Sequence, residues 1–286
     1  MNIEVADLFH DYEGRGSYAV SHLSFTIPEG TIFGFLGPSG AGKSTVQNLM
    51  TGLLPLQQGS ITYDGIPVAA LGRDFFNKVG YSFELPNVYA KLTGYENLKY
   101  YAGLFSGPTL DPLQLLEMVG LADAAHRRAG KYSKGMKQRL LFARSLINDG
   151  EVLFLDEPMS GLDPTTASRI KEIIKDQRAA GKTIFLTTHN MYAADELCDE
   201  VAFLHEGKTI AKDTPRDLKL QYGERSVAVE HRNGGDRTET VRLFLDREED
   251  RTRLASLVRE QKVVTMHSQE ATLEDIFIRL TGRSLS

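Results

Sequence analysis

The hydrophobic residues of the chain alternate between the spacings of strands and of helices. Residues 31–36 form a largely apolar run of strand length. Val46, Leu49, Met50 and Leu53 then follow at the i, i+3, i+4, i+7 spacing that places side chains on one face of a helix. The pattern therefore predicts a strand, a glycine-rich connection and a helix.

A strand, a helix and a second strand follow in the middle of the chain. Residues 151–158 contain an apolar run that indicates a strand buried on both faces, as in parallel sheets. Asp163 and Pro164 suit the N-cap and first position of a helix, which Gly181 would end. Residues 183–188 form the next strand. Such a crossover makes the two strands parallel, so their carboxyl ends meet at one edge of the sheet.

Other segments predict attachments to this α/β core. Residues 3–6 and 22–27 have the pattern of two more strands. Over residues 86–149 clear strands are absent, and helices are expected at 113–121 and 136–147. We therefore expect a helical insertion in the core.

The pattern beyond residue 223 predicts a small separate α/β unit. Asp246 is expected to cap its first helix, and Thr272 to open its last helix with Asp275 in a capping box. The expected elements are, in order, strands at 226–230 and 238–245 around a turn at Asn233-Gly234-Gly235, a helix carrying Leu254, Leu257 and Val258, a strand at 263–267, and the last helix.

The composition is that of an ordinary globular protein. The chain has 286 residues, 41% hydrophobic and 25% charged, which suffice for about two domains. The net charge of −5, without a long Lys/Arg run, gives no reason to expect a nucleic-acid partner. Cys198 is the single cysteine and cannot form an intrachain disulfide, as expected in the reducing cytoplasm. Because no apolar stretch approaches the ~20 residues of a membrane span, another chain would have to supply the spans of any membrane assembly.

The glycine-rich connection fits the phosphate-binding pattern G-x-x-x-x-G-K-[ST] at every fixed position. Its glycines let successive N–H groups point inward, and the following helix presents its positive end to phosphate. Lys43 is predicted to contact the outer phosphates and Ser44 to hold Mg²⁺. The flanking strand and helix argue against the alternative, a glycine-rich turn with a chance lysine. The loop consists of Gly37, Pro38, Ser39, Gly40, Ala41, Gly42, Lys43, Ser44 and Thr45.

Two carboxylates and a histidine are expected at one edge of the sheet. Asp156 and Glu157 follow the buried strand at the carboxyl edge, where open α/β sheets bind ligands. We predict that Asp156 holds Mg²⁺ and that Glu157 polarises the attacking water. His189 ends the next parallel strand and arrives at the same edge. The alternatives are a solvated acidic turn and a histidine that makes a structural hydrogen bond.

Two further candidates lie outside this edge. Tyr12, in the loop of residues 10–16, would either stack on adenine or pack on the surface. Ser133 is a good N-cap, and with Gly135 at a helix start it also forms a phosphate receptor. One ATP has a single γ-phosphate end, so this second receptor would serve a nucleotide held by another subunit.

Residues 1–222 resemble the nucleotide-binding subunit of an ATP-binding cassette (ABC) transporter, because five motifs occur in that family's order and spacing. The matching motifs are the Walker A loop at 37–45, the Walker B strand with its catalytic glutamate at 152–157, the D-loop at 160–163, the switch histidine His189 and, in altered form, the signature at residues 132–136. Tyr12 falls where members of the family stack the adenine.

The altered signature keeps the residues that matter most for phosphate. The family's usual Leu-Ser-Gly-Gly-Gln has Tyr132, Lys134 and Met136 in place of the leucine, the first glycine and the glutamine. Ser133 and Gly135 remain, and the resemblance implies that the segment contacts the γ-phosphate across a dimer. This variant is similar to the signature of bacterial exporters of the drug and antibiotic-resistance type.

A second departure lies in the Q-loop, where Glu84 stands in place of the usual glutamine. A glutamate can still bind Mg²⁺ and adds a negative charge beside it, so we expect a stronger dependence on metal and on nearby protonation. With residues 92–98, this feature is similar to the bacitracin and lantibiotic self-protection branch.

The resemblance implies a fold and a function. The fold is α/β, with a P-loop NTPase (RecA-like) core, an antiparallel β subdomain and a helical insertion, followed by a C-terminal accessory α/β domain at residues 223–286. The activity is Mg²⁺-dependent ATP hydrolysis that powers export of a drug, peptide antibiotic or lipid-like substrate through a separate integral membrane permease. Two copies, or one copy and a homologous cassette, would enclose ATP with Asp163 at their shared interface. The chain would then lie in the cytoplasm, peripheral on the inner face of the cell membrane.

Two other functions are compatible with a phosphate loop. Soluble ABC ATPases of DNA repair, chromosome organisation or translation usually have two cassettes, zinc-binding cysteines or long coiled coils, whereas this chain has one cassette, one cysteine and no sustained heptads. A P-loop kinase or GTPase would leave residues 133–139 and His189 without a role.

Overall fold

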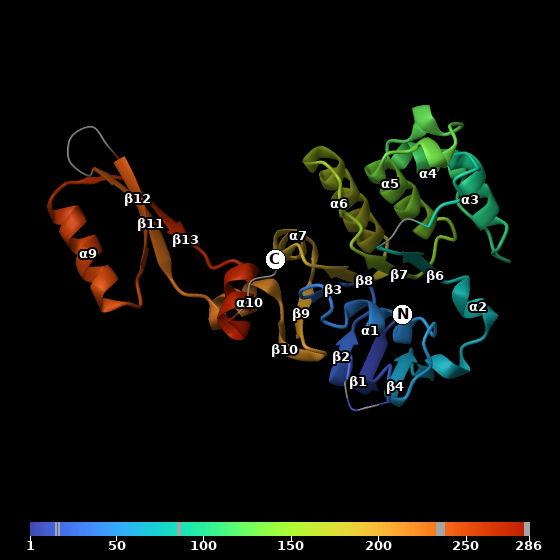
Figure 1. Cartoon of the computed structure of the whole chain (residues 1–286), viewed down its shortest axis with the longest axis horizontal. Helices are drawn as coiled ribbons and strands as arrows, with labels where there is room; N and C mark the ends of the chain where they lie inside the picture. Colours follow the sequence, from blue (N-terminus) through green and yellow to red (C-terminus); the bar gives the residue numbers. More distant parts are fainter. Residues whose placement is uncertain (15, 17, 85–86, 233–237, 283–286) are drawn as a thin grey trace. The chain divides into compact units, whose positions relative to one another are not determined.

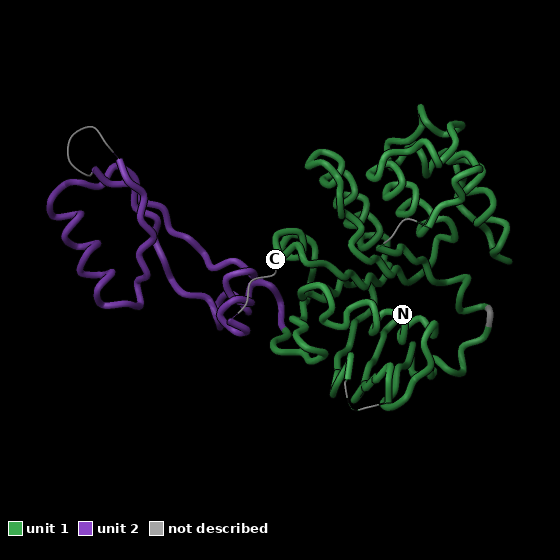
Figure 2. The backbone as a smooth tube through the Cα atoms, in the orientation of Figure 1, with its two compact units in different colours: residues 1–212 green, residues 213–286 purple. Residues whose placement is uncertain are grey.

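The computed structural model describes residues 1–14, 16, 18–84, 87–232 and 238–282. The chain forms two compact units, Met1–Lys212 and Asp213–Ser286, which we call the larger and the smaller unit (Figure 2). The sequence predicts this boundary after residue 222 instead. The boundary lies earlier because α8 (Pro215–Tyr222) packs against α10 (Leu273–Thr281), which belongs to the smaller unit.

A six-stranded sheet forms the centre of the larger unit, with the strand order β10-β9-β3-β8-β7-β6. Its central strands β3, β7 and β8 are buried along their whole length, as continuous apolar runs require. β3 pairs in parallel with β8 and β9, and β7 pairs in parallel with β6 and β8, which confirms the predicted crossover. The strands are β3 (Ile32–Leu36), β6 (Val79–Ser82), β7 (Val152–Asp156), β8 (Thr183–Thr188), β9 (Glu200–His205) and β10 (Lys208–Asp213).

A second, antiparallel sheet of the larger unit has the order β2-β1-β4-β5, as the predicted β subdomain requires. Its strands are β1 (Ile3–His10), β2 (Val20–Ile27), β4 (Gln58–Tyr63) and β5 (Ile66–Pro67). The helix α1 (Lys43–Met50) shares one core with both sheets through Val46, Leu49 and Met50. The predicted helix residue Leu53 lies beyond the end of α1 and is exposed.

The described residues between 87 and 149 contain helices and no strand, as expected for a helical insertion. Its helices are α3 (Gly94–Ala102), α4 (Pro112–Met118) and α5 (Lys134–Ser145), with short 3₁₀ turns at Ala122–Ala124 and Ala129–Lys131. In Figure 1, α5 and α6 lie on one side of β7 and β8, and β1, β2 and β4 lie on the other. The approach of α5 to β6 is close, because a Cβ added at Gly80 would lie 2.0 Å from the carbonyl oxygen of Ser145.

The remaining helices of the larger unit connect its strands. They are α2 (Arg73–Phe76), α6 (Pro164–Ala179) and α7 (Met191–Leu197), with a 3₁₀ turn at Val68–Ala70. Asp163 caps α6 and Pro164 begins it, as predicted. Across the part of the chain that the structure describes, no helix combines the length and the apolar character needed to cross a membrane.

The smaller unit is a three-stranded sheet of order β12-β11-β13, against which α9 packs. Its elements, besides α8 and α10, are β11 (Ser226–Arg232), β12 (Thr238–Phe244), α9 (Glu248–Arg259) and β13 (Val263–Gln269). The predicted capping box of α10 is present between Thr272 and Asp275. The predicted cap Asp246 is wrong: Arg247 occupies the N-cap, and Asp246 instead accepts hydrogen bonds from Arg225. The predicted turn at Asn233-Gly234-Gly235 lies outside the described residues.

The single cysteine is part of the core of the larger unit. Cys198 follows α7 and is buried, and burial raises the pKa of its thiol. A Cβ added at Gly34 would lie 2.6 Å from the Cys198 sulfur, so β3 packs directly against it. The thiol is therefore a packing group rather than a reactive one.

Candidate functional site

The phosphate loop connects β3 to α1 and depends on its glycines. A Cβ at Gly37 would lie 2.3 Å from the carbonyl oxygen of Leu204, a distance that backbone packing does not allow. Gly42 has a φ of 106°, and a Cβ there would lie 2.4 Å from the carbonyl oxygen of Ala19. Gly42 is also the N-cap of α1, and no side chain caps this helix. The first N–H groups of α1 are therefore not capped by a side chain, and their binding of phosphate stays a prediction.

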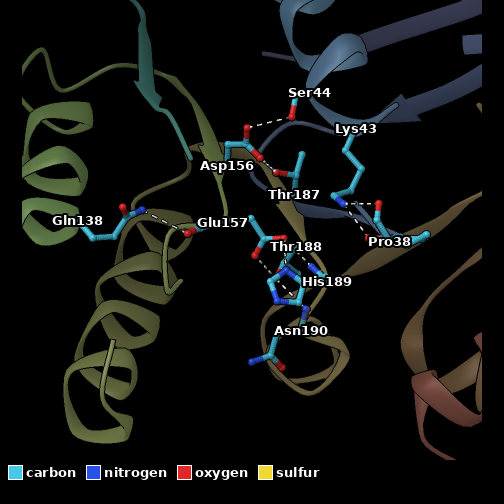
Figure 3. A network of polar contacts seen from close by, with 11 residues as sticks. Pro38, Lys43, Ser44, Gln138, Asp156, Glu157, Thr187, Thr188, His189 and Asn190 are labelled. Atoms are coloured by element: carbon cyan, nitrogen blue, oxygen red, sulfur yellow. Dashed lines mark hydrogen bonds and ion pairs between the residues drawn. The ribbon is translucent and has the colours of Figure 1, made fainter. Parts of the chain in front are cut away.

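Lys43 lies at the centre of the site's charges. Its Nζ donates to the carbonyl oxygens of Gly37 at 2.7 Å and of Pro38 at 3.0 Å (Figure 3). Burial lowers the pKa of Lys43, whereas the neighbouring carboxylates of Glu157, Asp156 and Glu84 act to raise it. All three predicted acidic residues therefore act on the same ammonium group.

Asp156, the last residue of β7, accepts hydrogen bonds from two hydroxyls. The Ser44 Oγ donates to one carboxylate oxygen at 3.2 Å, and the Thr187 Oγ1 donates to the other. The contact with Thr187 follows from the parallel register, in which Asp156 and Thr187 are partners. Burial raises the pKa of Asp156, and the charges of Glu84 and Glu157 add to this. The two groups predicted to bind Mg²⁺, Ser44 and Asp156, are thus direct neighbours.

Glu157 follows β7 with a positive φ of 47° and points its carboxylate at the end of β8. It accepts hydrogen bonds from the Thr188 hydroxyl at 3.0 Å, from the His189 backbone N–H at 2.7 Å and from His189 Nδ1 at 2.7 Å. Gln138 on α5 donates to the Glu157 backbone carbonyl at 3.3 Å. The structure therefore brings the predicted general base and the predicted histidine into contact.

Tyr12 lies beside the phosphate loop, although the residue is 61% exposed. Its hydroxyl is 3.1 Å from the Thr45 hydroxyl, and its ring forms a T-shaped pair with the His10 ring, with the centroids 4.6 Å apart. An exposed aromatic face at this position is what adenine stacking requires. That role stays a prediction.

Ser133 is the N-cap of α5, and its hydroxyl accepts from the Met136 N–H at 3.2 Å. Within the described residues, Ser133 makes no hydrogen bond to the phosphate loop of its own chain. A Cβ added at Gly135 would lie 3.4 Å from the side chain of Leu162, so the signature segment lies against the D-loop. Asp163 accepts from the Thr166 hydroxyl and backbone N–H, which lowers the Asp163 pKa.

Comparison with known proteins identifies the family. The profile described as ABC transporter matches residues 20–160. A fluoroquinolones export ATP-binding protein of Mycobacterium tuberculosis is 52% identical over 284 residues, which are 99% of this chain and 94% of that protein. The chain belongs to the ABC transporter family. A Nod factor export ATP-binding protein I of Rhizobium etli is 36% identical over 303 residues, covering 99% of this chain and 94% of that protein.

Solved structures agree with this assignment. The ATP-binding subunit of an ABC transporter superposes with a TM-score of 0.70 at 28% identity, covering 78% of this chain and 93% of that one. A dimeric ATP-binding cassette in a post-hydrolysis state with ADP and Pi has a TM-score of 0.67 at 25% identity, with coverage of 74% and 98%. The predicted P-loop NTPase fold is confirmed, and this ABC subunit is an ATPase.

The side chains of this ABC ATPase fit a magnesium ion whose remaining ligands would come from the nucleotide. No group of three or more His, Cys, Asp or Glu residues suited to a metal occurs in the described part of the chain. Mg²⁺ in such sites takes only one or two protein carboxylates and shares the phosphates of the substrate. Asp156 and the Ser44 hydroxyl supply such a set, and Glu84 contributes negative charge to it.

Sequence reasoning missed the hydroxyls that hold the two carboxylates. Thr187 donates to Asp156 and Thr188 donates to Glu157, one residue apart at the end of β8. A signal for them exists, because two consecutive threonines follow the apolar residues 184–186 in a strand that runs parallel to the Walker B strand. Gln138 gave no such signal, since only the packing of α5 brings it to Glu157.

Proposed function

We propose that this ABC ATPase powers export through a separate membrane permease, as one of two cassettes that close over ATP and Mg²⁺. The observation that carries the proposal is the set of Lys43, Ser44, Asp156, Glu157 and His189 at one edge of a parallel sheet. Each of these groups has a partner within the set or in the phosphate loop. The arrangement suits the binding and hydrolysis of a nucleoside triphosphate.

Each side chain has a separate task in hydrolysis. Bound Mg²⁺ and ATP supply the reacting phosphoryl group and the charge that stabilises its transfer. Lys43 would exchange its loop carbonyls for phosphate oxygens, and Ser44 and Asp156 would hold the cation, with Glu84 beside them. Glu157 orients water and accepts its proton. His189, which donates to Glu157, keeps that carboxylate in place.

The second cassette explains the signature segment. Ser133, Lys134, Gly135 and Met136 begin α5 and are not bonded to the phosphate loop of the same chain within the described residues. This helix start, where Ser133 caps the Met136 N–H, suits the γ-phosphate of a nucleotide on the other cassette. The dimeric state of a related cassette supports this arrangement, in which Asp163 lies at the shared interface. The second cassette is either another copy or a homologue.

A groove on the larger unit supports a permease partner. The groove has a volume of about 670 Å³ and lies between β6, α5 and the C-terminal end of α3. Its lining is mainly aromatic and apolar. Phe76 and Leu104 line it and are more than half exposed, as a docking surface requires. A short segment of a cytoplasm-facing permease loop suits its size. The ATPase would then be held at the inner face of the membrane.

The named relatives support export and favour a drug-like cargo. Two of them are a fluoroquinolones export protein and a Nod factor export protein, and both match nearly the whole chain. We therefore favour a drug or lipid-like cargo over the soluble ABC functions in DNA repair, chromosome organisation or translation. Selection of the cargo belongs to the permease.

Co-purification from membranes tests the proposal. The tagged chain, extracted in mild detergent, should bring down a membrane protein with several spans. Phe76→Asp in the groove should abolish this, whereas Leu53→Asp, an exposed apolar residue that does not line the groove, should not. A chain that brings down no membrane protein, or a Phe76→Asp variant that behaves like the control, would refute the proposed partner.

A further inference from the structure

The groove contains a buried arginine. Arg144 on α5 lines the groove with only 6% of its surface exposed. Its guanidinium donates to the Asn87 carbonyl at 3.2 Å, to the Asn87 side-chain oxygen at 2.7 Å and to the Tyr101 hydroxyl at 2.8 Å. It also lies 4.3 Å from the centre of the Tyr101 ring. All these partners are neutral at physiological pH.

Arg144 therefore carries a buried charge without a counter-ion. No carboxylate of the described residues forms an ion pair with it or contributes to its electrostatic environment, in which only tyrosines are prominent. Burying a charge without an opposite charge is costly, and arginine keeps its proton even so. A carboxylate that reached the guanidinium would gain a strong forked hydrogen bond in a place where water is largely excluded.

The rest of the groove is lined mainly by aromatic and apolar side chains, which indicate the apolar part of a ligand. Tyr81 and Phe83 continue the aromatic lining from β6, and Leu104 and Phe105 form the side beyond α3. Such a surface binds the apolar face of a short helix or turn. The groove therefore suits a segment that carries both apolar side chains and one carboxylate.

We propose that the permease segment seated in this groove presents an acidic side chain that pairs with Arg144. The proposal rests on the permease partner proposed above and adds the chemistry of the contact. Arg144 holds Asn87, which follows Glu84 by three positions, and it belongs to the helix that Ser133 begins. A carboxylate competes with Asn87 for the guanidinium. A ligand in the groove would therefore change the contacts of Asn87, which is close in the sequence to Glu84. Arg144 is a positioning residue and does not contact nucleotide.

Two designed peptides test the pairing on the isolated full chain. Both are blocked amphipathic helices with leucine and phenylalanine on one face, and they differ only in one glutamate or glutamine beside these residues. The glutamate peptide should bind at least about tenfold more tightly. In NMR spectra it should shift the Arg144 Nε–H signal and the Asn87 amide signals.

Variants separate the charge from the fold. Arg144→Gln should remove the preference for glutamate, and Arg144→Lys should keep part of it. Arg169→Gln is the matched control, because Arg169 also donates to backbone carbonyls, those of Met118 and Glu117, but does not line the groove. A thermal melt of each variant identifies loss of fold. If a variant does not fold, the comparison of the two peptides on the unmodified chain still tests the preference for glutamate.

Equal binding of the two peptides, no binding of either, or a preference that survives in a folded Arg144→Gln variant would overturn the proposal. These outcomes are distinct from failure of the proposed function. A permease that co-purifies equally well with Arg144→Gln and with the unmodified chain, combined with equal peptide binding, rejects the pairing and leaves the partner in place. A clear glutamate preference without a co-purifying permease supports the pairing of Arg144 with a carboxylate and rejects the permease as the partner.

Discussion

Asp156 and Glu157 are adjacent in the sequence, yet their carboxylates face different partners. Asp156 meets hydroxyls of the phosphate loop and of β8, whereas Glu157 meets His189 and Thr188. Asp156 is the last residue of β7, and Glu157 leaves the strand geometry with a positive φ of 47°, with its carboxylate at the end of β8. A non-glycine residue in this backbone region is uncommon and typical of functional sites. The two carboxylates are therefore placed for the separate roles proposed for them, Asp156 at the metal and Glu157 at the water.

Glu157→Gln should leave ATP binding intact and reduce turnover by at least about 100-fold, because the amide no longer accepts a proton from water. ATP should then remain bound and hold two chains together. Gel filtration with ATP and Mg²⁺ should show a dimer. Glu151→Gln, at an exposed glutamate just before β7, serves as the control and should behave like the unmodified chain. A monomeric Glu157→Gln variant with normal turnover would contradict the role.

Asp156→Asn should stabilise the chain in the absence of metal and nucleotide. Burial raises the folded-state pKa of Asp156, so the ionised carboxyl disfavours folding at pH values above that pKa. Removing it should increase the free energy of unfolding at pH 7, and the gain should shrink as the pH falls and the carboxyl becomes protonated in both states. Urea denaturation at pH 7 and pH 5 measures this. An equal or larger gain at pH 5 would contradict it.

Glu84→Gln should change the dependence of hydrolysis on Mg²⁺. Glu84 contributes negative charge to Asp156 and Lys43, and its removal should raise the half-saturating Mg²⁺ concentration by about threefold to tenfold. A metal titration at saturating ATP measures the shift. Identical titrations of the two proteins would show that Glu84 has no part in the metal site.

At the scale of elements, the features set by residues close in the sequence were predicted correctly, whereas the features set by contacts between distant residues were not. The phosphate loop, the central strands β3, β7 and β8 and the caps at Asp163 and Thr272 follow from residues close in the sequence, and the structure contains them all. Asp246 was misassigned because Arg225, twenty-one positions away, provides a better partner than a helix start. The hydroxyls of Thr187 and Thr188 depend on strand register, which spacing within one segment does not reveal. The domain boundary likewise depends on the contact of α8 with α10.

Gly80→Ala should loosen the attachment of α5 to the sheet. Its new Cβ would lie within 2.0 Å of the Ser145 carbonyl oxygen, so helix or strand must move, at a cost of about 1–3 kcal/mol. Chemical denaturation should show this loss together with weaker ATP turnover, because α5 carries Ser133. Gly72→Ala is the control, since nothing lies near its Cβ position and its φ is −80°. Equal stability of the two variants would argue against close packing at Gly80.

At the scale of the whole molecule, each compact unit contains a hydrophobic core among the residues that the structure describes. The larger unit has the core that joins both sheets to α1, and the smaller unit has a core around Val227, Val229, Leu243 and Leu257. The groups assigned to nucleotide and metal all belong to the larger unit. Ligand binding should therefore act on the stability of one unit directly.

Calorimetry of the Glu157→Gln variant tests this difference. ATP and Mg²⁺ at about 100 times the dissociation constant should stabilise the larger unit by about 2.7 kcal/mol, which raises its transition by roughly 5–10 °C. The transition of the smaller unit should stay where it is. Adding Lys43→Ala should abolish the shift, because the phosphate contact is lost. Equal shifts of both transitions would contradict the assignment of the site to one unit.

The inert thiol of Cys198 has a practical consequence. Because it is the only cysteine in the chain and lies buried against β3, maleimide reagents should ignore the folded protein. A cysteine introduced at an exposed position, such as Leu53 or Tyr192, would then accept a fluorophore or spin label selectively. The proposed closure of two cassettes over ATP can thus be followed with such labels without first replacing the native residue.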